Sequence, residues 1–174
     1  MYIPNDLEYN SNNFNKLEYC SMNTLDNFDI SILKELQNNA HISHQELADK
    51  VNLSKTPCWR RVRKLEQMGV IKNYVALLNP TKIGLTVMAY VQVSMKNHDI
   101  ETLSIFNDFV AHSPYILECS AITGNYDYIM RVTAKDTAEL EKFLMNKLLT
   151  LNVIQSTNSN FILGQRKSTT QLPL

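Results

Sequence analysis

Several features that mark common classes of protein are missing from this 174-residue sequence. Its three cysteines, Cys20, Cys58 and Cys119, lie far apart and show no paired ligand spacing, which argues against a structural zinc site and favours a reduced compartment. The longest apolar run, residues 83–93, is interrupted by polar residues and is far too short to span a membrane. The N-terminus has no apolar signal core. These absences predict a cytoplasmic chain without metal or membrane anchor.

An overall excess of one charge is missing too, because 17 Lys and Arg residues balance 17 Asp and Glu residues. The distribution is uneven, however. Residues 54–67 hold five Lys/Arg against one Asp/Glu, whereas the first 24 residues hold one against three. Positive charge is therefore concentrated on one short segment, as expected of a chain that meets a polyanion at one place.

That basic segment forms the second half of a predicted helix-turn-helix, residues 43–69. Ser43 and Ser54 are each placed to cap a helix, because a serine hydroxyl accepts from backbone N–H groups that lack an intrahelical partner. Glu46 follows Ser43 at the capping-box spacing. A short turn over residues 51–53 separates the two helices, and this layout is typical of DNA-binding proteins.

The second of these helices separates an apolar stripe from a basic face at about 100° per residue. The stripe consists of Cys58, Val62 and Leu65. Guanidinium groups bond guanine edges and cations neutralise phosphates, so the opposite face predicts binding of double-stranded DNA. The alternative is a solvated amphipathic helix. The candidate DNA contacts on this face and its flanks are Ser54, Lys55, Thr56, Trp59, Arg60, Arg63, Arg61 and Lys64.

The pattern along the whole chain predicts two domains with an arm, a hinge and a tail. A first helix is expected to begin after Asp26, its N-cap, and to run to about Asn38, and a linking strand is expected from Val70 to Leu78. The expected segments are a flexible N-terminal arm (1–24), a helix-turn-helix domain (25–71), a linking strand and hinge (72–84), a second domain (85–166) and a C-terminal tail (167–174).

The second domain is predicted to be a ferredoxin-like βαββαβ sandwich, which makes the chain an α+β protein. Strands are expected over 85–96, 116–123, 126–134 and 153–163, with helices from Ile100 to before Pro114 and from Asp136 or Thr137 onward. Met88, Tyr90 and Ile162 would lie on the sheet face that carries no helix. An apolar patch of that kind is usually covered by another subunit, which favours a homo-oligomer.

This combination resembles the Lrp/AsnC (leucine-responsive, or feast/famine) family of transcriptional regulators, over residues 25–174. The resemblance is carried, in order, by LDNFDISILKELQNNAHIS (25–43), LSKTPCWRRVRKLEQMGVI (53–71), ALLNPTKIG (76–84), ITGNYDYIM (122–130) and KSTTQLPL (167–174). Many members have proline where this chain has Lys55 and glycine where it has Asn52. Neither departure affects the expected fold.

The resemblance implies that residues 54–63 lie in the major groove and that the second domain dimerises through its sheet. Dimers of the family often assemble into tetramers or octamers. It also implies an amino-acid effector site between neighbouring C-terminal domains, built around the hairpin turn, which by position would involve Gly124, Asn125, Tyr126 and Asp127. The alternative is an ordinary Asn-containing hairpin turn with no ligand. No other cofactor is implied, and DNA binding would place the protein on the nucleoid.

Two further functions compete with an effector-tuned regulator. One is an architectural protein that wraps DNA as a ring of dimers without a ligand. The other is enzymatic, because some proteins of related build decarboxylate haem precursors. The four histidines here form no cluster with a catalytic partner, and a helix with five cations argues against that activity.

Overall fold

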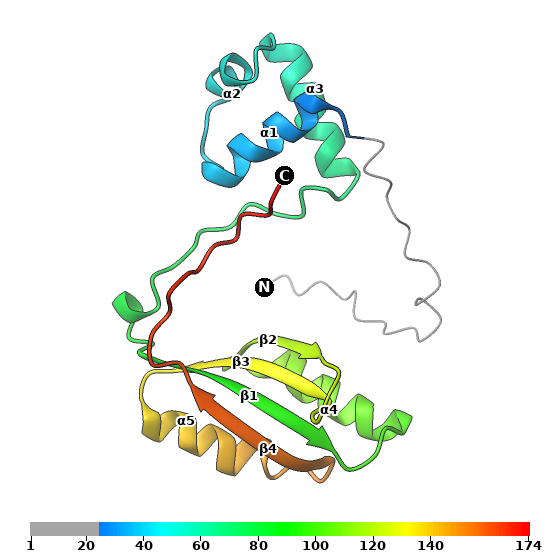
Figure 1. The fold of residues 1–174 in the computed structure, drawn as a ribbon, viewed down its shortest axis with the longest axis vertical. Helices are drawn as coiled ribbons and strands as arrows, with labels where there is room; N and C mark the ends of the chain where they lie inside the picture. The colour runs from blue at the N-terminus through cyan, green and yellow to red at the C-terminus, as the bar shows by residue number, and fades with distance from the viewer. Residues whose placement is uncertain (1–24) are drawn as a thin grey trace. The chain divides into compact units, whose positions relative to one another are not determined.

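The computed structural model describes residues 25–174, so the expected flexible arm over residues 1–24 lies outside the described part (Figure 1). The described residues form two compact units. The first comprises residues 25–75 together with Thr169–Leu174, and the second comprises Ala76–Ser168. No helix in the described part is long and apolar enough to cross a bilayer.

The first unit contains three helices, α1 (Asn27–Asn38), α2 (His44–Lys50) and α3 (Lys55–Gln67). Local capping chemistry fixes where two of them begin. Asp26 and Ser43 each accept backbone N–H groups of the first turn, and the acidic residue at the third helical position returns a bond to the cap backbone. Both predicted helix starts are therefore confirmed. Ser54 occupies the cap position of α3, but its side chain makes no capping hydrogen bond.

One core holds the three helices together. Ile32 and Leu33 of α1, Leu47 and Ala48 of α2, and the α3 stripe enclose a buried cluster. The predicted stripe is confirmed, since Cys58, Val62 and Leu65 are all buried. Asn52 sets the angle between α2 and α3 by adopting φ +54°, a left-handed conformation that asparagine tolerates better than most residues.

The predicted linking strand over residues 70–78 is wrong for the single chain, where this segment has no regular structure. A strand exists only when its backbone groups pair with a neighbour, and the described residues offer this segment none. Val75, Leu77 and Leu78 are left 69–73% exposed. The hinge that follows contains a short 3₁₀ helix, Thr81–Ile83, which ends at Gly84 with φ +86°.

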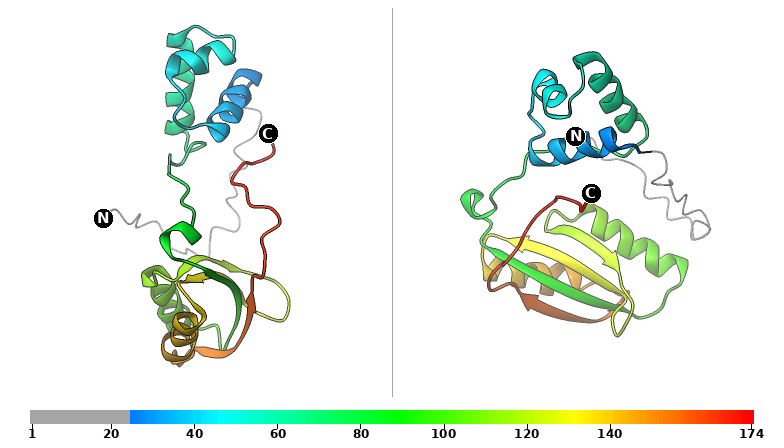
Figure 2. Two further views of the ribbon diagram at one scale, coloured as in Figure 1. Left: turned by 90° about the vertical axis from the view of Figure 1, so that its left-hand side faces the viewer. Right: turned by 45° about the horizontal axis from the view of Figure 1, so that its top comes forward.

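The second unit is an antiparallel sheet with two helices, and the predicted ferredoxin-like order is confirmed. Its elements are β1 (Val87–Met95), α4 (Ile100–His112), β2 (Ile116–Ala121), β3 (Tyr128–Ala134), α5 (Thr137–Phe143), a π-helical turn (Leu144–Leu148) and β4 (Ile154–Phe161). The strand order is β2-β3-β1-β4. Both helices lie on the same face of the sheet, as the edge-on view in Figure 2 shows.

Burial alternates along β1, and this alternation shows which face of the sheet is packed against the helices. Val91 and Val93 are fully buried against α4 and α5, together with Met130 and Val132 of β3. Tyr90 lies on the opposite face and is 42% exposed. Cys119 packs at the edge of this core, and burial raises the pKa of its thiol to about 11.

Candidate functional site

The outer face of α3 is the first candidate site. Residues of α3 opposite the buried stripe stand out into solvent, because the stripe uses up the side of the helix that packs on α1 and α2. Of the eight predicted DNA contacts, seven are exposed and only Arg61 is half-buried. The structure therefore brings the predicted residues onto one surface, with Arg61 at its margin.

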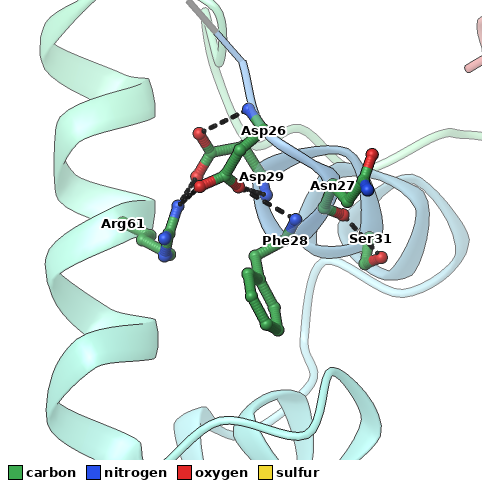
Figure 3. Close-up of polar contacts among 6 residues, drawn as sticks. All are labelled: Asp26, Asn27, Phe28, Asp29, Ser31 and Arg61. Atoms are coloured by element: carbon green, nitrogen blue, oxygen red, sulfur yellow. Dashed lines mark hydrogen bonds and ion pairs between the residues drawn. The ribbon is translucent and has the colours of Figure 1, made fainter.

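Arg61 is held by α1 and is not a free cation (Figure 3). Its Nη1 lies 2.7 Å from Asp26 Oδ2 and 2.7 Å from Asp29 Oδ1. Asp29 is only 2% exposed, so its carboxylate depends on this partner. The hydrogen bonds that Arg61 donates to Asp29 and Asp26 raise the pKa of its guanidinium. Arg61 also lies 5.4 Å from the centre of the Phe28 ring.

Arg63 is partly restrained by its neighbours on α3. Its guanidinium lies 5.1 Å from the centre of the Trp59 ring and 3.2 Å from Glu66 Oε2. Stacking on an aromatic ring orients a guanidinium without removing its donors. Trp59, 42% exposed, is thus part of the surface that presents Arg63.

The remaining cations of α3 are unpaired within the described part of the chain. Among the described residues, no ion pair reaches Lys55, Arg60 or Lys64. An exposed cation without an internal counter-ion can neutralise a DNA phosphate, and no ion pair within the protein has to break first. Arg60, Arg61 and Lys64 line one hollow of about 460 Å³ beside the start of α3.

The β2–β3 hairpin is the second candidate site. Gly124 has φ +118°, a backbone conformation that residues with a side chain rarely adopt. A Cβ at this position would meet nothing within 4 Å, so conformation and not crowding requires glycine. Gly124 and Asn125 are exposed, whereas Tyr126 and Asp127 are half-buried.

Asp127 joins the hairpin to the end of β1. Its Oδ2 accepts the backbone N–H of Met95 at 2.7 Å, and its Oδ1 lies 3.0 Å from Nε2 of His98. The Met95 N–H, followed by His98, lowers the pKa of the Asp127 carboxyl. Nothing in the sequence pattern marked His98, because it lies in the connection before α4 and 29 positions from its partner.

A cavity of about 680 Å³ lies elsewhere in the second unit, between α4 and the end of α5. Phe109, Tyr115 and Phe143 form its aromatic wall, and Lys147 of the π-helical turn also lines it. None of the four hairpin residues lines this cavity. Within the described residues, no group of three or more His, Cys, Asp and Glu side chains is arranged to hold a metal ion.

Two family models match the chain, and between them they cover nearly all of its described part. Residues 25–72 match a winged helix-turn-helix DNA-binding model. Residues 88–172 match the Lrp/AsnC ligand binding domain. The first match contains α1 to α3, and the second contains the whole sheet and the hairpin.

Curated relatives align along almost their whole length. The chain is 37% identical over 150 residues to the DNA-binding transcriptional activator DecR of Escherichia coli, covering 86% of this chain and 99% of the relative. It is 35% identical over 164 residues to the leucine-responsive regulatory protein of Haemophilus influenzae, covering 94% and 99%.

Solved structures agree with these relatives. A transcriptional regulator from Neisseria meningitidis, crystallised in complex with L-Met, superimposes with a TM-score of 0.83 at 36% identity, covering 86% of this chain and 96% of that one. The AsnC structure from Escherichia coli gives a TM-score of 0.79 at 26% identity, covering 86% and 99%.

Proposed function

Because the chain belongs to the Lrp/AsnC family of DNA-binding transcriptional regulators, we propose that α3 enters the major groove and that the hairpin of the second unit takes a small amino-acid effector. The family regulates transcription, so the chain is not an enzyme, and the decarboxylase alternative is set aside. Binding to chromosomal DNA would place the protein on the nucleoid, in the cytoplasm.

The DNA proposal rests on the difference between the cations of α3 that are exposed to solvent and those that are held by other residues of the chain. Arg60 and Lys55 are exposed, have no counter-ion among residues 25–174, and lie on the first turns of α3, which is where a recognition helix meets base edges. Arg63, oriented by Trp59, would follow one turn later, with Ser54 and Thr56 as hydroxyl donors. Lys64 would neutralise a phosphate. Arg61 is proposed as a positioning residue that fixes α3 on α1.

Binding to a labelled fragment of the protein's own promoter region, measured by fluorescence anisotropy at several salt concentrations, tests the DNA proposal. Arg60→Ala should weaken binding about tenfold or more, because a lost bidentate base contact costs about 1–3 kcal/mol. Lys64→Ala should flatten the slope of log affinity against log salt by about 0.9 for one lost phosphate contact. Lys34→Ala, an exposed cation on α1, is the matched control. Equal affinities for Arg60→Ala and Lys34→Ala would refute the assignment.

Chemistry at the hairpin supports the effector proposal. Oδ1 of Asp127 keeps acceptor capacity beyond His98, which suits an α-ammonium group. The exposed backbone around Gly124 lets a carboxylate approach N–H groups closely. The relative from Neisseria meningitidis was crystallised with an amino acid, L-Met, and the matching domain model is one of ligand binding.

A thermal-shift screen of the twenty amino acids separates this proposal from the architectural alternative. A ligand that binds only the folded protein raises its melting temperature with concentration. We expect one amino acid or a few to do so, and Gly124→Val to abolish the shift. If no amino acid raises the melting temperature at any concentration, the DNA-wrapping protein without a ligand becomes the better description.

The helix-free face of the sheet is proposed as the surface for self-association into dimers, with tetramers or octamers built from them. Tyr90 is 42% exposed there, and a large apolar side chain left in water on a sheet face favours a covering partner. Light scattering on the Tyr90→Arg variant should show a smaller particle than the wild type, and an unchanged mass would refute this interface.

A further inference from the structure

The C-terminal segment Thr169–Leu174 belongs to the first compact unit, although it follows the last strand of the second. Its path begins beside the start of β1. The backbone N–H of Ile162 donates to the carbonyl of Met88 at 2.9 Å, immediately after β4 ends at Phe161. The chain therefore enters and leaves the sheet at adjacent positions. The two units are joined by two connections, one before β1 and one after β4.

Gln37, in the last turn of α1, holds the tail by its side-chain amide. Leu172 donates its backbone N–H to Gln37 Oε1 at 2.6 Å, and Gln37 Nε2 donates to the Leu172 carbonyl at 3.3 Å. One amide thus satisfies both backbone groups of one residue, as a neighbouring strand would. Only glutamine and asparagine carry a donor and an acceptor in this arrangement, and glutamine has the longer reach.

A second contact fixes the tail one residue earlier. Nε2 of Gln171 donates to Oδ1 of Asn38 at 2.6 Å, at the C-terminal end of α1. The Gln171 backbone N–H in turn donates to the hydroxyl of Thr169 at 3.1 Å, a local bond that shapes the tail before it docks. Chain termini are usually frayed unless specific contacts tie them down, and these contacts do so.

We infer that the C-terminal end of α1 is a docking surface for the chain's own segment Thr169–Leu174, and that docking restrains the DNA-reading unit. A unit joined by a single linker rotates freely about it, whereas a second connection removes most of that rotation. Rotational freedom that the docked tail has already removed costs no further entropy when DNA binds. The docked tail therefore strengthens DNA binding by preorganisation. The docking itself does not depend on the proposed function; only its effect on DNA binding does.

Amide hydrogen exchange on the full-length protein tests the docking. The Leu172 amide should be protected in the wild type, and Gln37→Ala should lower its protection about tenfold or more, because the substitution removes both hydrogen bonds to Leu172. Gln67→Ala is the matched control, since Gln67 is an exposed glutamine at the end of α3 without a hydrogen bond among the described residues. An unprotected Leu172 in the wild type, or protection that survives Gln37→Ala, would overturn the docking.

Cross-linking and DNA binding test the other two parts of the inference. With Cys20 and Cys119 replaced by serine, Lys34→Cys on α1 with Leu174→Cys keeps Gln37 and its contacts, and a short bismaleimide should then give an internally linked monomer on a denaturing gel. A covalent dimer instead would show that the tail docks on a second copy. DNA affinity should fall about two- to tenfold in Gln37→Ala and stay unchanged in Gln67→Ala. Unchanged affinity in a variant whose tail is released would overturn the restraint on DNA reading.

Discussion

Replacing Arg61 with alanine is expected to destabilise the helix-turn-helix unit, whereas replacing its neighbour Arg60 should weaken DNA binding and leave stability intact. The Asp29 side chain is 3% exposed and has the Arg61 guanidinium at 2.7 Å. Removing one partner of a buried ion pair costs about 3–5 kcal/mol, because the other charge is left without compensation.

The expected loss for Arg61→Ala is smaller than that range, about 2–3 kcal/mol, for two structural reasons. The Arg61 side chain is itself 30% exposed, so water already screens part of the interaction. The Asp26 backbone N–H also continues to donate to Asp29 Oδ2 at 3.3 Å. Arg60→Ala touches no internal partner among the described residues and should change stability by less than about 0.5 kcal/mol.

Trp59 makes the assay specific to this unit, because it is the only tryptophan of the chain and lies on α3. Urea unfolding followed by its fluorescence reports the helix-turn-helix without a signal from the sheet domain. Asp29→Asn combined with Arg61→Ala should be more stable than Arg61→Ala alone, since the uncompensated charge is gone. The reasoning fails if Arg61→Ala unfolds at the wild-type urea concentration yet loses DNA binding as Arg60→Ala does.

Three further outcomes are expected from local geometry. Gly124→Ala should destabilise the sheet domain by about 1–2 kcal/mol through its positive φ alone, seen as an earlier thermal transition by circular dichroism; no change would show that the turn relaxes. The Asp127 carboxyl has its pKa lowered from 3.8 by the Met95 N–H, so its contribution to stability is present above that value and lost as pH falls below it; acid titration of Asp127→Asn should lack this component. Ser43→Ala should cost about 1 kcal/mol of helix-turn-helix stability in the fluorescence assay, whereas Ser54→Ala, which removes no capping bond, should cost less.

Features encoded by short stretches of sequence could be predicted because their chemistry is local. The caps at Asp26 and Ser43 involve residues three positions apart, and the buried stripe of α3 follows from the helical period. The alternation along β1 likewise separated buried Val91 and Val93 from exposed Tyr90. Strand and helix order then left few topologies for the second unit.

Contacts between distant parts of the chain could not be predicted in the same way. A helical projection places Arg61 on the flank of α3, but only the packing of α1 decides whether a carboxylate 32 positions away reaches it. The same holds for His98 and Asp127, and for Gln37 and Leu172, which are 135 positions apart. The expected strand over 70–78 failed for a related reason, because pairing depends on a neighbour that the sequence of the segment does not specify.

If assembly covers that unpaired segment, the lifetime of the chain would depend on its own concentration. Val75, Leu77 and Leu78 are exposed to water in a segment without regular structure, and such segments are preferred sites of proteolytic cleavage. A newly made chain that meets no partner stays open to cleavage there, at the junction between its two units. Chains that pair this segment in an assembly would be spared. Proteolysis would thus remove subunits made in excess and set a threshold below which the regulator does not accumulate.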